Sequence, residues 1–163
     1  MRRYFVSSTA NGSNAINCYV FNAQSIVNKL YDLHHILYEQ YDVKIDCVLI
    51  TETWLSSHII DGQLDPRSEF TIMRKDRSDG RGGGVCIIVK KCFAIVPLMF
   101  SSNYDLLEVT GFDFVNVLPP VRVLVAYRPP YYDHMAVNVA STFIEFLSLN
   151  TPLVVSSTSL LVT

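Results

Sequence analysis

Short apolar segments bounded by polar residues recur along the chain, and their spacing predicts a definite order of strands and helices. The segment INCYVFN predicts a buried strand that ends at Asn22. The residues that follow place apolar side chains three and four positions apart, as on one face of a helix: Ile26, Leu30, Leu33, Leu37 and Tyr41. The run CVLITETWL then predicts a second strand. This part of the chain therefore predicts a β-α-β unit.

Consecutive strand patterns dominate the middle of the chain. FTIMRKDRSDGRGGGVCIIVKKC predicts a strand, a glycine-rich turn and a strand, and FAIVPL, LLEVTGFDFVNV and VRVLVAYRPP predict further strands. A second amphipathic helix is expected over Asp133–Leu149, before a final strand or two in LVVSSTSLLVT. Strands that follow one another favour an antiparallel or mixed sheet with helices packed outside it. The expected fold class is α+β, with sheet dominating.

Composition places these elements in one globular domain. Half of the 163 residues are hydrophobic and 17% are charged, which excludes disorder over most of the length. We expect a poorly ordered segment over residues 1–15 and the domain over 16–163. Apolar runs stay well below the ~18 residues that cross a membrane, and the N-terminus lacks a signal-peptide core. Four cysteines without CxxC spacing predict buried free thiols, and hence an intracellular protein of the nucleus or cytoplasm rather than a secreted one.

Positive charge is concentrated in the segment Arg74–Lys91. It holds six basic and two acidic residues, a local charge of +4 within a chain of net charge −2. A basic patch could meet the phosphates of a nucleic acid, whereas a solvated loop and an edge strand protected by lysine are the ordinary explanation. The glycine cluster in this segment leads into a strand rather than a helix, so it is not a P-loop, and it predicts a turn that allows close backbone packing.

Three polar residues stand at the predicted carboxyl ends of strands: Asn22, Glu52 and Tyr127. A half-buried carboxylate such as Glu52 needs a hydrogen-bonded partner or a metal. An amide, a carboxylate and a phenol in one crevice would suit Mg²⁺ and a phosphate. Each residue also has a structural explanation: Asn22 as a helix cap, Glu52 as a surface acid and Tyr127 as an aromatic at the edge of the core.

Four motifs follow one another in a recognisable order: NAQSIVNKLYDL, LITETWL, RKDRSDGRGGGVCIIV and LVAYRPP. Over roughly Ile16–Phe146 the chain resembles the endonuclease domain of non-LTR (LINE-type) retrotransposons, of the endonuclease/exonuclease/phosphatase superfamily. The resemblance implies a two-sheet β-sandwich flanked by helices, and hydrolysis of a DNA phosphodiester with Mg²⁺ or Mn²⁺. It also implies that Glu52 and Asn22 serve the metal and that Tyr127 contacts the scissile phosphate.

The resemblance also implies that four arginines contact DNA: Arg74, Arg77, Arg81 and Arg128. The family's later GDFN and SDH motifs are absent, and residues 150–163 contain no Asp, Glu or His. We therefore expect the C-terminal portion of the fold to be missing, apolar strand faces to be left uncovered, and activity to be weak or lost, as in a truncated gene model or a decayed copy. The alternatives are a non-catalytic nucleic-acid-binding remnant and a superfamily phosphatase that acts on a phospholipid. Membrane and protein partners are not implied.

Overall fold

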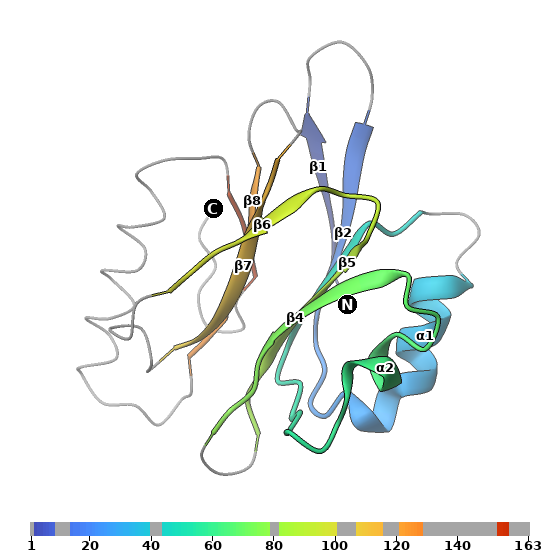
Figure 1. The fold of residues 1–163 in the computed structure, drawn as a ribbon, viewed down its shortest axis with the longest axis vertical. Coiled ribbons are helices and arrows are strands. Elements are labelled where there is room, and N and C mark those ends of the chain that lie inside the picture. Colours follow the sequence, from blue (N-terminus) through green and yellow to red (C-terminus); the bar gives the residue numbers. More distant parts are fainter. Residues whose placement is uncertain are drawn as a thin grey trace.

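Two β-sheets face each other, and two helices cover the outer face of the larger sheet (Figure 1). The computed structural model describes residues 2–8, 14–39, 44–78, 82–100, 107–115, 121–128 and 153–156. The larger sheet has the strand order β1 (Arg2–Ser8), β2 (Asn14–Asn22), β3 (Cys47–Thr51), β5 (Val85–Lys90), β4 (Phe70–Lys75). The smaller sheet has the order β6 (Ile95–Pro97), β7 (Glu108–Phe114), β8 (Arg122–Tyr127), β9 (Leu153–Ser156). The helices are α1 (Leu30–Tyr38), which follows a 3-10 turn (Val27–Lys29), and α2 (Asp61–Leu64).

The predicted β-α-β unit and the mixed sheets are confirmed. Strands β2 and β3 are parallel neighbours with α1 between them in sequence, and Asn22 lies opposite Thr51. Strands β4 and β5 form the antiparallel pair expected on either side of the glycines, and β6, β7 and β8 are also antiparallel neighbours. The chain thus has the predicted α+β class, with sheet dominating.

The main apolar core lies between the two sheets. Residues of β2, β3 and β5 meet residues of β7 and β8 there, and Phe112 is the largest fully buried side chain. Burying these apolar side chains is the dominant favourable term in forming the sandwich. The inner face of the larger sheet is therefore covered, contrary to the expectation that apolar strand faces would be left open.

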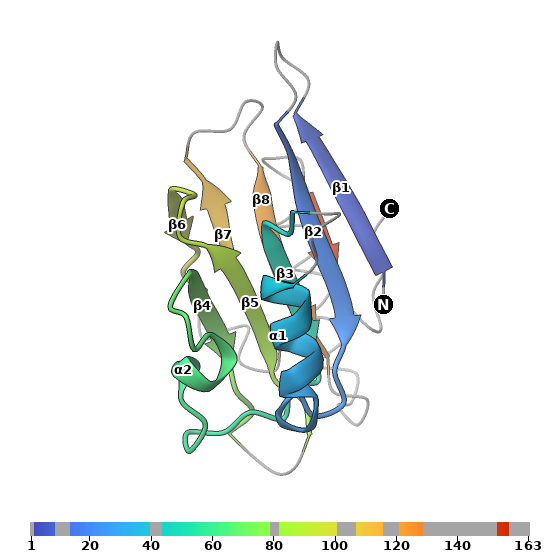
Figure 2. The ribbon, with the colours of Figure 1, turned by 90° about the vertical axis from the view of Figure 1, so that its right-hand side faces the viewer.

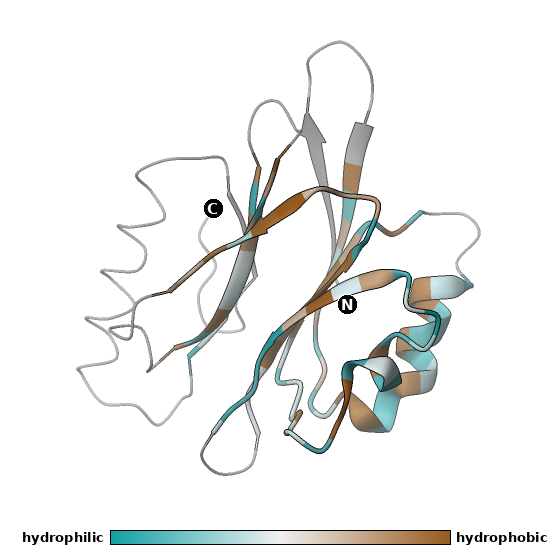
Figure 3. Ribbon diagram, in the orientation of Figure 1, coloured by the Kyte–Doolittle hydropathy of each residue, from teal (hydrophilic) through white to brown (hydrophobic). Residues whose placement is uncertain are grey.

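A second core forms where α1 packs on the opposite face of the larger sheet (Figure 2). Ile26, Leu33 and Leu37 are buried there, as the helical spacing predicts, while Tyr41 lies outside the described residues. Figure 3 shows polar and apolar positions alternating around α1, as expected for a helix that packs on one side only. This helix layer fixes the loop that leaves β2, which carries part of the site described below.

Some features differ from the expected order. Strand β1 pairs antiparallel with β2, although residues 1–15 were expected to lack order. Cys18, Cys47 and Cys86 are buried free thiols as predicted, whereas Cys92 is exposed because it lies in the turn after β5. The helix expected over Asp133–Leu149 lies outside the described residues. Within the described ranges, no helix is both long and apolar enough to cross a membrane.

Candidate functional site

Asn22 and Glu52 lie side by side where β2 and β3 end. Asn22 is the last residue of β2, and Glu52 directly follows β3. Because the two strands are parallel neighbours, their carboxyl ends meet at one edge of the sheet. The Asn22 amide Nδ2 donates a hydrogen bond of 2.7 Å to Oε1 of Glu52, and the Asn22 Oδ1 accepts one of 3.1 Å from the backbone N–H of Gln24. The half-buried carboxylate thus has the hydrogen-bonded partner that its position requires.

Tyr127 joins this pair from the other sheet. It is the last residue of β8, and it is buried in the core between the sheets. Burial raises the pKa of its phenol, and the charge of Glu52 together with a hydrogen bond between the two side chains raises it further, while the Arg77 cation lowers it. The net effect is a raised pKa, so Tyr127 is a neutral hydroxyl at pH 7. The structure therefore brings Asn22, Glu52 and Tyr127 together, while their catalytic roles stay predictions.

The backbone around this pair is strained. Among the described non-glycine residues, positive φ angles occur at Gln24 (45°), Ser25 (83°), Glu52 (52°), Trp54 (54°) and Ser68 (55°). All but Ser68 lie within three residues of Asn22 or Glu52. Such conformations cost about 1–3 kcal/mol each, persist only where the surroundings impose them, and cluster at functional sites.

Backbone hydrogen bonds on both sides impose this conformation on the segment that follows β3. The N–H of Ser25 donates to the carbonyl of Glu52 (3.1 Å), and the N–H of Ile26 donates to that of Thr53 (2.9 Å). On the other side, the N–H of Trp54 donates to the carbonyl of Gly83 (2.9 Å). The segment Thr51–Trp54, called the TETW segment, is thus held between the loop after β2 and the glycine loop before β5. This confirms the close backbone packing predicted for those glycines.

A buried acid that the sequence did not suggest, Glu108, connects the two sheets at this site. Its Oε1 accepts a hydrogen bond of 2.5 Å from Nε of Arg77, and its Oε2 accepts one from the backbone N–H of Gly84. Glu108 is the first residue of β7 and lies opposite Tyr127 in the ladder. The carboxylate therefore ties the strand pair that carries Tyr127 to the glycine loop that holds TETW. A lone acid at the head of an apolar strand was the only available signal.

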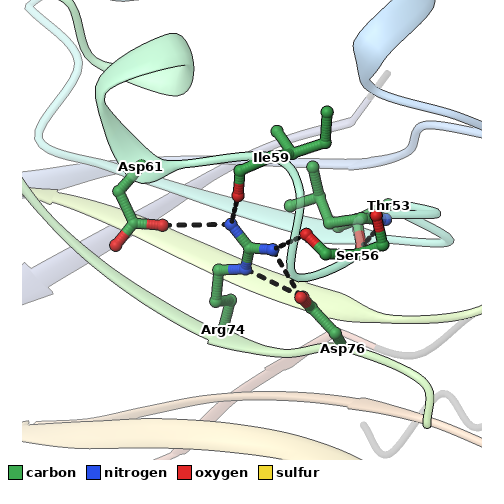
Figure 4. Close-up of polar contacts among 7 residues, drawn as sticks. Thr53, Ser56, Ile59, Asp61, Arg74 and Asp76 are labelled. Atoms are coloured by element: carbon green, nitrogen blue, oxygen red, sulfur yellow. Dashed lines mark hydrogen bonds and ion pairs between the residues drawn. The ribbon is translucent and has the colours of Figure 1, made fainter.

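Arg74 stabilises the loop that follows TETW (Figure 4). Its guanidinium donates to Asp76 (2.8 Å from Nε to Oδ1), to Asp61 (3.1 Å), and to the carbonyls of Ile59 (2.7 Å) and Ser56 (2.8 Å). Hydrogen bonds to Asp76 and the charges of both aspartates raise the pKa of Arg74 against the effect of burial. The geometry gives this arginine a structural role within the protein.

Arg74→Ala is expected to lower the free energy of unfolding by about 2 kcal/mol, because the change leaves two carbonyls and a partly buried aspartate without their charged donor. Urea denaturation followed by circular dichroism measures the change. Lys75→Ala is the matched control, since Lys75 is the exposed neighbour on the same strand. Equal midpoints for the two variants would contradict the structural role.

The other charges of the Arg74–Lys91 segment are also largely engaged by protein groups. Arg77 pairs with Glu108, Lys90 lies 3.9 Å from Asp46, and Lys91 donates to the carbonyl of Ser68 (2.7 Å). Arg81 lies outside the described residues. Arg128 follows Tyr127, and its buried Nε has no hydrogen-bond acceptor among the described residues. Of the described arginines among those offered for DNA contacts, Arg77 and Arg128 lie beside the site.

The donors around Glu52 suit a hard divalent cation. Within the described ranges, no group of three or more His, Cys, Asp or Glu side chains is placed to hold a metal. A carboxylate and an amide at a sheet edge nevertheless match the needs of Mg²⁺, which keeps several waters and uses one or two carboxylates plus substrate phosphate. Thiolate or imidazole ligands would favour zinc instead. The residues present thus fit Mg²⁺ or Mn²⁺ with Glu52 as ligand and Asn22 beside it.

Solved structures with this arrangement of sheets are known. The 3′ phosphatase NExo from Neisseria, bound to a product DNA hairpin, has a TM-score of 0.62 and 13% identity, over 86% of this chain and 56% of its own. The chain has the endonuclease/exonuclease/phosphatase fold. TDP2 from D. rerio, complexed with a single-strand DNA product, has a TM-score of 0.55 and 10% identity, over 87% of this chain and 59% of its own. The human Nocturnin catalytic domain with bound sulfate has a TM-score of 0.52 and 11% identity, over 96% and 66%.

These likenesses concern the fold, because identities of 10–13% are too low to carry a function. The chain spans between 56% and 66% of the length of those three structures. No family model matches the sequence, and no curated protein matches it either.

Proposed function

We propose that this chain carries part of the active site of a metal-dependent DNA endonuclease of the non-LTR retrotransposon type, which hydrolyses a phosphodiester. The hydrogen bond between Asn22 and Glu52, beside Tyr127, is the observation that carries the proposal. This arrangement places an oriented carboxylate and a neutral phenol at neighbouring strand ends of the endonuclease/exonuclease/phosphatase fold. Two proteins of the same fold hold DNA products in their structures, which supports DNA as the partner. A nuclear or cytoplasmic place of action is part of the proposal.

In this proposal the residues divide the work between the metal and the phosphate. Glu52 would hold Mg²⁺ or Mn²⁺, and Asn22 would keep the carboxylate oriented through its 2.7 Å hydrogen bond. The bound cation would withdraw charge from a phosphate oxygen and so favour attack by water. Tyr127, kept neutral by its raised pKa, donates its hydroxyl to Glu52 in the structure, and would donate it to another phosphate oxygen instead once the cation takes its place at the carboxylate.

The non-catalytic nucleic-acid-binding remnant is less well supported. That alternative relied on the basic segment Arg74–Lys91, and most of its described charges are paired with acids or carbonyls. Paired cations release fewer counterions on meeting a phosphate backbone, so they add less to affinity. Nothing in the described residues favours a phospholipid substrate over DNA.

The test is nicking of a supercoiled plasmid by the 163-residue chain in Mg²⁺, against the same chain in EDTA. We expect slow, metal-dependent nicking, because no group of three or more His, Cys, Asp or Glu side chains gathers around Glu52 in the described residues to hold the cation and activate water. Glu52→Gln should reduce the rate about 100-fold or more, because an amide keeps the shape but loses the ligand charge. Glu69→Gln, an exposed acid outside the site, should leave the rate unchanged.

Two outcomes would contradict the proposal. Nicking that is equal in wild type and Glu52→Gln would show that the activity comes from elsewhere. A folded chain, shown by a cooperative melt, that binds DNA but does not nick it would support the non-catalytic alternative.

A further inference from the structure

A pocket of about 500 Å³ adjoins the proposed site. Its walls come from three segments: the loop after β2 with the following 3-10 turn, the TETW segment with the loop after it, and the two described ends of the connection between β4 and β5. The lining side chains include Ser25, Val27, Asn28, Trp54, Ile59 and Arg77. Neither Glu52 nor Tyr127 lines the pocket, so it is a separate compartment beside the proposed catalytic residues.

Each wall of the pocket is directly joined to a residue of the proposed site. The N–H of Ser25 donates to the carbonyl of Glu52 (3.1 Å), and Trp54 lies two residues beyond Glu52. The guanidinium carbon of Arg77 lies 5.8 Å from the ring centroid of Tyr127. A polymer held at the proposed site would thus pass close to this pocket.

The walls combine an aromatic ring with amide and hydroxyl groups. Trp54 is half-buried and held at a positive φ of 54°, and its indole lies near Gly82, where an added Cβ atom would sit 3.6 Å from Nε1. Asn28 Nδ2 donates to Oγ of Ser25 (3.1 Å), which leaves the Asn28 carbonyl oxygen as an acceptor beside that hydroxyl. Val27 and Ile59 add apolar surface.

The charge balance of the pocket favours a neutral ligand over an anion. Arg77 is the one charged side chain among the described lining residues, and Glu108 pairs with its Nε at 2.5 Å. A single cation that its carboxylate partner neutralises suits a neutral ligand better than it suits a phosphate.

We propose that this pocket binds a nucleobase of the DNA strand, one that flanks the phosphate held at the proposed site; the inference rests on the proposed function. The base would stack on Trp54, an interaction open to every base because each has a π-face. Its edge would meet the carbonyl oxygen of Asn28 and the hydroxyl of Ser25. The pocket is large enough for one base with its sugar, and it would give the enzyme a contact that depends on unstacked bases rather than on backbone charge.

Trp54 is the only tryptophan of the chain, so its fluorescence reports on the pocket directly. The full chain, in EDTA so that no cleavage occurs, is titrated with a ten-nucleotide single-stranded DNA and with a fully abasic strand of the same length. We expect quenching by the first strand and an affinity at least about tenfold weaker for the second, because base–aromatic stacking is lost. Equal affinity and quenching for both strands would overturn the inference, because the pocket would then follow the phosphate backbone.

Variants are compared by the fluorescence anisotropy of the labelled ten-nucleotide strand. Trp54→Ala and Asn28→Ala should each weaken binding severalfold to tenfold or more, and Trp54→Phe should retain most of it. Met99→Ala, which removes a 92% exposed side chain just after β6, is the control. Circular dichroism confirms that each variant is folded. If Trp54→Ala does not fold, the binding of Asn28→Ala tests the inference. Binding by folded Asn28→Ala that equals wild type for both strands would overturn the inference.

The two proposals fail separately in this design. Glu52→Gln should lose nicking and keep base-dependent quenching, because Glu52 does not line the pocket. Base-dependent quenching without any nicking by wild type would retain the pocket and reject hydrolysis. Nicking without a difference between the two strands would retain hydrolysis and reject the pocket.

Discussion

Glu108→Ala is expected to lower the free energy of unfolding by about 3–5 kcal/mol, the cost typical of removing one partner of a buried ion pair. The Glu108 residue is 7% exposed, and its two oxygens accept from Arg77 and from the backbone N–H of Gly84. Without the carboxylate, a largely buried guanidinium and a buried N–H both lose their acceptors. Urea denaturation followed by circular dichroism measures the loss.

A double-mutant cycle separates the ion pair from simple loss of packing. Arg77→Met alone should also destabilise the protein, because it strands the Glu108 carboxylate. The double variant should lose less than the sum of the two single variants, since no charge is then left buried without a partner. Glu69→Ala removes an exposed acid and should change stability by less than about 0.5 kcal/mol. Additive losses in the cycle would contradict the pairing.

The same substitution should affect the proposed activity beyond its effect on stability. Glu108 lies opposite Tyr127 in the ladder between β7 and β8, and it ties that ladder to the loop beside Glu52. Its loss frees the two sheets to shift where Tyr127 and Glu52 meet. Misplacing a reacting group by about 1 Å can cost about 100-fold in rate.

The positions of Asn22, Glu52 and Tyr127 could be predicted because each ends a strongly apolar strand. The parallel β-α-β unit brings two of these strand ends to one edge of the sheet. The sequence signals for this unit were local: an amphipathic helix pattern between two apolar runs. Hydrophobic periodicity is the strongest such signal, which also explains why the burial of Leu33 and Leu37 was predicted correctly.

The structural roles of Glu108 and Arg74 could not be identified because most of their partners are distant in sequence. Glu108 bonds to a residue 31 positions away, and Arg74 reaches carbonyls 15 and 18 positions away. Such contacts depend on how the sheets and loops meet, which no local pattern encodes. The charge count therefore suggested a basic surface in Arg74–Lys91, whereas packing turns most of the described cations inward to acids and carbonyls. Strand β1 was missed because its apolar core, YFV, is only three residues long.

Gly84→Ala is expected to destabilise the protein by about 3 kcal/mol, for two separate reasons. The residue has a φ of +82°, which costs a residue with a Cβ atom about 1–2 kcal/mol. The added Cβ atom would also lie 2.4 Å from Oγ1 of Thr53, a fully buried side chain held by the hydrogen bonds around TETW. Overpacking at such a position costs about 1–3 kcal/mol more. Urea denaturation of the single variant measures the sum.

The two contributions separate in a variant that also carries Thr53→Ala. Removing Oγ1 relieves the clash but leaves the unfavourable φ, so the double variant should recover about 1 kcal/mol or more relative to the sum of the single losses. Gly62→Ala is the matched control, because an added Cβ there meets only Ile60 at 4.0 Å, and stability should stay unchanged or rise slightly. Additive losses for Gly84→Ala and Thr53→Ala would mean that these two residues do not touch. The TETW segment would then not be held against the glycine loop, and close packing on that loop would no longer explain the position of Glu52.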